Sequence, residues 1–201
     1  MHYIVGLGNP GLEYENSRHN TGRMSVMKLL KDLKIEDLEI SKKANALIAE
    51  GKIGKEKFTT ILPETYMNRS GNSVSYFIKP KNKTSKRGIE NLIVVHDDID
   101  LPIGTIKISY NKGTGGHRGL DSIIKVLKTK EFVRVRIGIS PKTAKGKIKK
   151  PEGEKNVLDF ILGKFKTNEF KELKKVFEKT NQAIDCIVSE GKDKAMNIYN
   201  K

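Results

Sequence analysis

Leu92-Ile93-Val94-Val95-His96-Asp97-Asp98 joins a four-residue apolar run to three polar residues that can carry chemistry. A short run that is apolar at every position is typical of a strand covered on both faces, as in a parallel sheet between helices. We therefore expect residues 92–95 to form a central strand, with His96 and Asp97 at its end. Active sites of open α/β sheets gather at such strand ends.

Segments with strand and helix patterns alternate on both sides of this run. The other expected strands are 3–7, 46–49, 58–62, 105–110 and 133–139. Apolar residues at helical spacing predict helices over about 21–33, 69–78 and 120–127, and C-terminal helices over about 167–199. The basic, proline-containing segments 79–88 and 141–155 are expected to be loops, the second of them mobile. The alternation, without a break in composition, predicts a single α/β domain over residues 1–201 with a mixed, twisted β-sheet surrounded by helices.

The charge balance points to nucleic acid as the partner. The formal net charge is +15, and Lys and Arg side chains bind nucleic acid by releasing counterions from its phosphates. Solvated helix faces would also account for part of this excess. The single cysteine, Cys186, lies in an apolar helical stripe and is expected in the core. No apolar run approaches the ~20 residues of a membrane span, and no signal peptide is evident, so a cytoplasmic protein is expected.

Gly6-Leu7-Gly8-Asn9-Pro10-Gly11 matches the G-x-G-x-x-G pattern of dinucleotide-binding proteins. In those proteins the pattern opens a helix, whereas residues 11–16 carry no apolar helical stripe. No acidic residue follows a second strand at the expected distance. A nucleotide-dependent oxidoreductase is therefore disfavoured, and the glycines are better explained as tight turns that bring Asn9 and the backbone close to a substrate.

Three histidines, His19, His96 and His117, lie at ends of expected strands or before expected helices. Their spacing fits no zinc motif, and no G-x-S-x-G sequence marks a nucleophilic serine. What remains is a histidine that activates water, oriented by Asp97 or Asp98. Esters have better leaving groups than amides, and such a pair can hydrolyse them without metal, cofactor or covalent intermediate.

Five segments, in this order, resemble the signatures of bacterial peptidyl-tRNA hydrolases. They are Gly6–Gly11 with Tyr14 and Arg18–Gly22, then Thr65–Gly71, His96–Gly104, Gly115–Leu120 and Arg134–Ile139. The resemblance implies a metal-free esterase that cuts peptide from the 3′ end of tRNA, with no cofactor. It implies His19 as general base, Asp97 as the residue that orients it, and Asn9 as the group that recognises the blocked amino end. It further implies substrate or tRNA contacts by Tyr14, Tyr66, Met67, Asn68, His117, Arg118, Lys107, Lys112 and Arg134.

The chain departs from the family pattern at two positions. Arg118 stands where asparagine is usual, which predicts a changed contact to the tRNA 3′ end. Ser109 stands where some members place a lysine that clamps the 5′-phosphate with the equivalent of Arg134, so Lys107 or Lys112 is expected to take that role. The rival hypothesis from the same fold is a non-catalytic RNA-binding relative. We expect a monomer without an obligate protein partner or a membrane.

Overall fold

The computed structural model describes residues 1–78, 88–143 and 146–201. The loop expected over 79–88 falls outside these residues except for Gly88. The strands are β1 (His2–Gly6), β2 (Glu39–Ser41), β3 (Ala46–Ile53), β4 (Glu56–Pro63), β5 (Leu92–Pro102), β6 (Ile106–Tyr110) and β7 (Val133–Ser140). The helices are α1 (Thr21–Asp32), α2 (Ser70–Phe77), α3 (Arg118–Leu127), α4 (Glu154–Leu162), α5 (Thr167–Glu190) and α6 (Lys192–Tyr199), with short 3-10 turns η1 (Arg18–Asn20) and η2 (Met67–Arg69).

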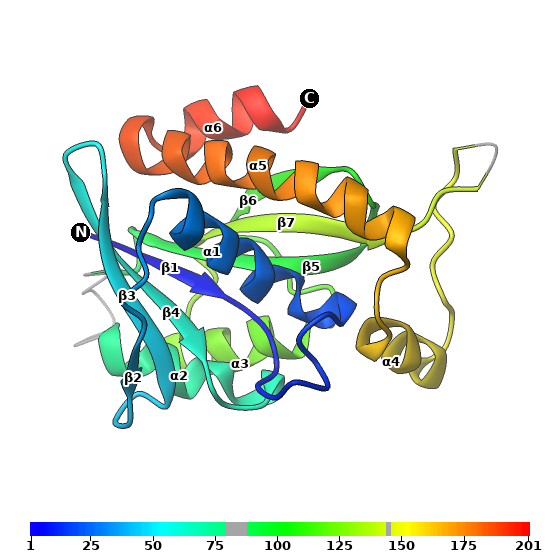
Figure 1. Cartoon of the computed structure of the whole chain (residues 1–201), viewed down its shortest axis with the longest axis horizontal. Helices are drawn as coiled ribbons and strands as arrows, with labels where there is room; N and C mark the ends of the chain where they lie inside the picture. Colours follow the sequence, from blue (N-terminus) through cyan, green and yellow to red (C-terminus); the bar gives the residue numbers. More distant parts are fainter. Residues whose placement is uncertain (79–87, 144–145) are drawn as a thin grey trace.

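The described strands form one mixed sheet in the order β2-β3-β4-β1-β5-β7-β6 (Figure 1). Strands β4, β1, β5 and β7 are parallel, while β2, β3 and β6 are antiparallel to their neighbours. The chain leaves β1 towards β4 on one side and then returns to β5 on the other. Ligand sites of such sheets lie at the carboxyl ends of the strands where the order reverses, here β4, β1 and β5.

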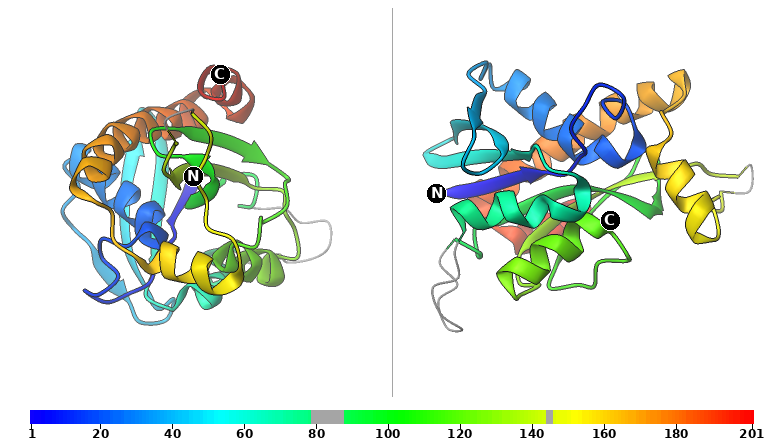
Figure 2. Two further views of the ribbon diagram at one scale, coloured as in Figure 1. Left: turned by 90° about the vertical axis from the view of Figure 1, so that its right-hand side faces the viewer. Right: turned by 90° about the horizontal axis from the view of Figure 1, so that it is seen from below.

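Helices cover both faces of the sheet, as Figures 1 and 2 show. Helices α1 and α5 pack on one face, and one apolar cluster joins them to residues such as Ile4, Val95 and Ile137. Helices α2 and α3 pack on the other face, around Val5, Leu7 and Val94. The predicted α/β fold class, a mixed sheet surrounded by helices, is therefore confirmed. Cys186 lies buried in the α5 side of the core, as expected.

Strand β5 is longer than the apolar run that predicted it. Pairing with β1 stops at Val95, but pairing with β7 continues to Asp98 before a register shift, and the strand ends at Pro102. The prediction that His96 and Asp97 end the strand was therefore wrong, because a neighbour on one side alone sustains its extended backbone. Past Val95 the strand has an open edge towards η1.

Glycine 22 sets the distance between the start of α1 and this strand. A Cβ at Gly22 would lie 2.2 Å from the carbonyl oxygen of Val95, closer than any side chain allows. Leu7 N also donates to Val95 O at 3.0 Å. The glycine thus lets η1, the turn directly before α1, approach the open edge of β5.

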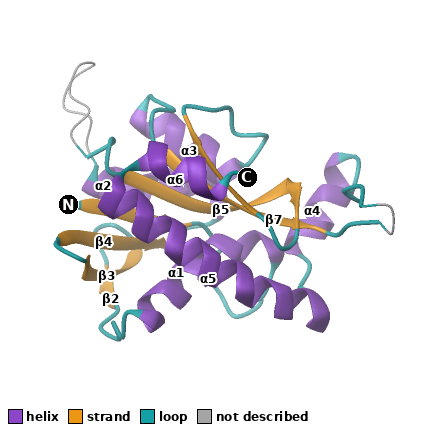
Figure 3. Cartoon of the chain, turned by 90° about the horizontal axis from the view of Figure 1, so that it is seen from above, coloured by secondary structure: helices purple, strands orange, loops and turns teal. Residues whose placement is uncertain are grey.

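Helix α4 was not expected, since residues 141–155 were predicted as a loop and no element was predicted for residues 156–162. None of its residues is fully buried, and Figure 3 shows it standing clear of the other helices at one end of the sheet. A short, half-exposed helix gives a weak periodic signal. Strand β2 was also missed, because its three residues are too few to show an alternating pattern. Among the described residues, no helix combines the length and the apolar character needed to cross a bilayer.

Candidate active site

The site is built at the carboxyl ends of β1, β4 and β5. His19 lies in η1, after the turn-rich segment that follows β1, and is 6% exposed. Residues 11–16 form turns rather than a helix, so Gly6–Gly11 does not open a helix as a dinucleotide-binding loop does. Asp97 comes from β5, and His117 stands at the start of α3.

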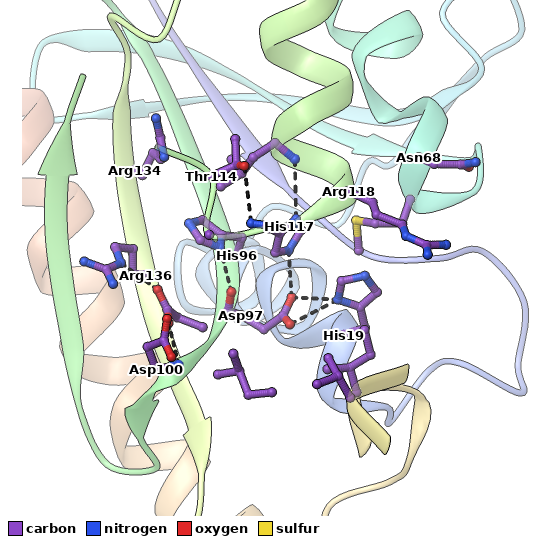
Figure 4. Close-up of a pocket in the computed structure, with 18 of the residues that line it drawn as sticks. His19, Asn68, His96, Asp97, Asp100, Thr114, His117, Arg118, Arg134 and Arg136 are labelled. Carbon is purple, nitrogen blue, oxygen red and sulfur yellow. Dashed lines mark hydrogen bonds and ion pairs between the residues drawn. The ribbon is translucent and has the colours of Figure 1, made fainter. Parts of the chain in front are cut away.

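Asp97 lies between two imidazoles, as Figure 4 shows. Its carboxylate faces His19 Nδ1 at 3.0 Å from Oδ2 and 3.1 Å from Oδ1. His117 Nε2 is 3.0 Å from Oδ1. All three side chains are at most 8% exposed, so these contacts are shielded from water.

The surrounding hydrogen bonds decide which nitrogen of each imidazole carries the proton. His117 caps α3, and its Nδ1 accepts from the backbone N–H groups of Gly119 at 3.1 Å and Leu120 at 3.4 Å. Its Nε2 must therefore carry a proton and donate it to Asp97. His19 likewise donates through Nδ1, which leaves its Nε2 lone pair to accept a proton from another molecule.

Asp97 is ionised in this arrangement. Burial alone would raise the pKa of its carboxyl, but the imidazoles of His19 and then His117, with their two hydrogen bonds, hold that pKa well below its ordinary value. A fixed negative charge at this point would stabilise an imidazolium at His19.

His96 supports Asp97 from the backbone side. Its Nδ1 donates to the carbonyl oxygen of Asp97 at 2.6 Å, and its ring packs edge-on against His117 with 4.9 Å between centroids. Burial, and then the neighbouring His117, lower the pKa of His96 well below 6.5, so the ring is neutral at cell pH. No role was expected for this residue beyond its place in a motif.

Asp98, the alternative orienting carboxylate, points elsewhere. Its Oδ2 accepts from Arg136 Nε at 2.6 Å, and its Oδ1 accepts from the backbone of Asp100 at 2.8 Å. The carboxylate that contacts His19 is therefore Asp97, the one favoured from the sequence.

Asn9 is held in one orientation by two partners. Its Oδ1 accepts from Met67 N at 2.8 Å, which turns the Nδ2 donor group away from that contact. Asn20 fixes the Asn9 backbone, accepting from Asn9 N at 2.8 Å and donating to Asn9 O at 2.9 Å. Asn20 had no assigned role, since a residue that positions another through its backbone leaves no separate sequence signal.

A cavity of about 760 Å³ opens in front of these groups. Apart from Lys107, every site residue expected from the sequence lines it. Lys107 is exposed on β6 and does not border the cavity. One wall was not predicted, the apolar face of α4, formed by Val157, Leu158, Ile161 and Leu162.

The basic residues at the cavity differ in availability. Arg134 is only 1% exposed, and its guanidinium donates to the carbonyl oxygens of Lys112 and Gly113. Arg118 is exposed and pairs with Glu154 of α4 at 3.0 Å, across the mouth of the cavity. The Lys112 side chain lies exposed at the rim.

His19, Asp97 and His117 are also the described residues whose ligand atoms lie close enough, within 4.8 Å, to hold a metal ion together. A metal on His117 Nε2 would require its proton to move to Nδ1, which faces two N–H donors. The hydrogen bonds around His117 therefore favour a chain of imidazole–carboxylate contacts over a metal centre.

Helix α4 is anchored beside the turn that carries His19. The buried Arg18 donates to Lys164 O at 2.7 Å and to Glu169 Oε2 at 2.8 Å, and it stacks on Phe160 with its Cζ 4.6 Å from the ring centroid. Arg18 N also donates to Gly163 O at 3.0 Å. The turn that carries His19 and the end of α4 are thereby fixed to each other.

Comparisons with known proteins identify the family of the chain. The family model described as peptidyl-tRNA hydrolase matches residues 3–201. Peptidyl-tRNA hydrolases of Thermodesulfovibrio yellowstonii and Syntrophotalea carbinolica are 39% and 36% identical to the chain, which they cover completely, over 100% and 97% of their own lengths. The crystal structure of peptidyl-tRNA hydrolase from Acinetobacter baumannii superposes with a TM-score of 0.83 at 31% identity, over 98% of this chain and 93% of that one. The chain belongs to the peptidyl-tRNA hydrolase family of enzymes.

Proposed function

We propose that the chain hydrolyses the ester that joins a peptide to the 3′ end of tRNA, with His19 as general base. One observation carries this proposal: a buried carboxylate fixes His19 through Nδ1 and leaves Nε2 free within a cavity. A histidine held in this way accepts a proton from water at neutral pH.

The reaction proceeds through a tetrahedral intermediate. Water attacks the ester carbonyl carbon while its proton passes to His19 Nε2, and Asp97 stabilises the resulting imidazolium. The carbon–oxygen bond to the ribose then breaks, and His19 returns the proton to the leaving oxygen. The products are a peptide carboxylic acid, which ionises in water, and a tRNA with a free 3′-terminal hydroxyl.

Asn9 distinguishes blocked from free amino ends in this proposal. Because its oxygen is occupied by Met67 N, the group left to meet a substrate is the Nδ2 donor. The carbonyl of a blocked amino group is an acceptor and matches this donor. A free ammonium group is a donor only, and two donors facing each other lose a hydrogen bond, which costs about 1–3 kcal/mol.

The two halves of the cavity suit the two parts of the substrate. The apolar face of α4 accommodates the peptide, while Tyr14, Tyr66, Met67 and Asn68 contact the esterified residue and the 3′-terminal nucleotide. Basic groups around the rim, among them Lys112, Arg118 and the more distant Lys107, meet phosphates, which fix position without reading sequence. We further propose that the enzyme acts as a cytoplasmic monomer without an obligate protein partner.

Substrate selectivity tests this assignment. Wild type is expected to release N-acetyl-amino acid from N-acetyl-aminoacyl-tRNA and to spare the unblocked aminoacyl-tRNA. Asn9→Asp replaces the donor by an acceptor, so the preference for the blocked substrate should fall by about 10- to 100-fold. An unchanged preference would remove Asn9 from this role. A wild type that binds tRNA and releases nothing would instead favour the non-catalytic RNA-binding relative.

A further inference from the structure

The buried position of Arg134 argues against a direct contact with a phosphate. It lies on β7 beside Ser109 of β6 and is 1% exposed. Figure 4 shows it on the side of His96 that is remote from His19. An anion would have to displace the covering chain before it could reach the guanidinium.

The covering chain is the glycine-rich segment between β6 and α3, residues 112–116. Arg134 Nη1 donates to Gly113 O at 2.7 Å, and Nη2 donates to Lys112 O. The guanidinium carbon also lies 5.1 Å from the centroid of the Phe132 ring, which limits rotation of the side chain. One planar fork thus holds two successive carbonyl groups, a geometry that lysine cannot reproduce.

This segment needs such a clamp because of its composition. Gly115 and Gly116 both adopt left-handed backbone conformations, with φ of +63° and +80°, and glycine loses the most backbone freedom when it is ordered. The segment then ends at His117, whose N–H donates to Thr114 O at 3.2 Å. The position of the segment therefore sets where His117 Nε2 meets the Asp97 carboxylate.

We propose that Arg134 is a positioning residue: it fixes residues 112–116, and through them His117 and Asp97, while Lys112 at the rim makes the phosphate contact. This inference rests on the proposed roles of His19 and Asp97. It changes the role expected from the family resemblance, in which Arg134 itself would clamp the 5′-phosphate.

A double-mutant-type cycle, in which both Arg134 and the 5′-phosphate of the substrate are changed, distinguishes a positioning role of Arg134 from phosphate binding. Arg134→Gln and Arg134→Lys are assayed on N-acetyl-aminoacyl-tRNA with and without its 5′-phosphate, over a range of salt concentrations. We expect kcat to fall by about 10- to 100-fold on both substrates alike, as for a misplaced catalytic group. The ratio of kcat/KM between the substrates and its salt dependence should stay at the wild-type values.

Lys112→Ala is the matched comparison, because it removes a rim charge without touching the clamp. It should raise KM, leave kcat unaltered, and reduce the slope of log(kcat/KM) against log salt by about one. The proposal would be overturned if Arg134→Gln behaved in this way instead, with kcat retained and the effect of the 5′-phosphate lost.

A measurement on the wild type covers the case in which the Arg134 variants do not fold. In protein labelled with ¹⁵N-arginine and ¹⁵N-lysine, a 5′-phosphorylated RNA minihelix should shift the Lys112 signal and leave the Arg134 side-chain signals nearly unmoved. The largest shift at Arg134 would refute the proposal. Failure of the proposed function is distinguishable, since it would appear as an inactive wild type in the hydrolysis assay.

Discussion

Replacing Asp97 by asparagine changes the number of acceptors without changing the size of the side chain. The carboxylate accepts from His19 Nδ1 at 3.0 Å and from His117 Nε2 at 3.0 Å. An asparagine keeps one of the two oxygens and puts an NH₂ group, which is a donor, in place of the other. His117 cannot exchange its proton between nitrogens, because its Nδ1 accepts from Gly119 and Leu120. The oxygen must therefore take the place of Oδ1 in front of His117, and the NH₂ group takes the place of Oδ2, 3.0 Å from His19 Nδ1.

The rate should then collapse for a reason specific to His19. An NH₂ group opposite Nδ1 favours the tautomer with the proton on Nε2, and that tautomer cannot act as the base. The buried negative charge that stabilises the imidazolium is lost as well. Together these effects predict a fall in kcat of about 10³- to 10⁴-fold, or about 4–5.5 kcal/mol in the barrier.

Single-turnover hydrolysis of N-acetyl-aminoacyl-tRNA at saturating enzyme measures this effect. Asp98→Asn is the matched control, since the Asp98 carboxylate pairs with Arg136. Its kcat should change by less than about tenfold, which is smaller than the loss of a general base. Adding His117→Ala to Asp97→Asn frees the amide to turn its oxygen towards His19, so part of the rate should return. An Asp97→Asn enzyme within tenfold of wild type, or a double variant slower than the single one, would refute the tautomer argument.

Three further outcomes follow from the same structure. Gly22→Ala should lower the melting temperature and kcat together, because its Cβ would lie 2.2 Å from Val95 O and push η1 away from β5. Calorimetry and hydrolysis rates test this, and an unchanged melting temperature would contradict it. Asn20→Ala removes both hydrogen bonds to the Asn9 backbone. It should lower the free energy of unfolding, measured in denaturant titrations, by about 1–3 kcal/mol and raise KM. An unaltered KM would show that Asn9 does not need this support. Burial lowers the pKa of His96 in the folded protein, so as the pH falls through 6.5 this residue takes up a proton only in the unfolded chain. The free energy of unfolding therefore decreases below pH 6.5. Between pH 7 and 5.5 wild type should therefore lose about 1 kcal/mol more than His96→Asn, and equal losses would contradict a neutral His96.

The fold was predictable where the pattern was strong. The apolar run 92–95 and the alternating segment 133–139 both lie in the parallel core of the sheet, as β5 and β7. Elements with few buried residues were missed, namely α4, which has no fully buried residue, and the short edge strand β2. A pattern of apolar residues records burial, so it says little about elements that stay half-exposed.

The sequence predicted which residues lie at the candidate site better than it predicted what each of them contacts. The sequence brought His19, Asp97 and Asn9 to one place through the family resemblance, and the structure places all three along one cavity. It could not reveal that Arg134 turns towards the backbone of residues 112–113, because the direction of a buried side chain depends on the segment packed over it. Nor could it reveal Asn20 or His96, which act by holding the backbone of a neighbour.

His19 is the base on which the proposed hydrolysis depends. The decisive measurement is single-turnover release of N-acetyl-amino acid from tRNA by wild type and by His19→Ala, in excess EDTA, with tRNA binding measured in parallel. We predict fast release by wild type and a loss of about 10²- to 10⁴-fold in the variant, with tRNA affinity retained. A His19→Ala enzyme that folds, binds tRNA and hydrolyses at the wild-type rate would contradict the central claim.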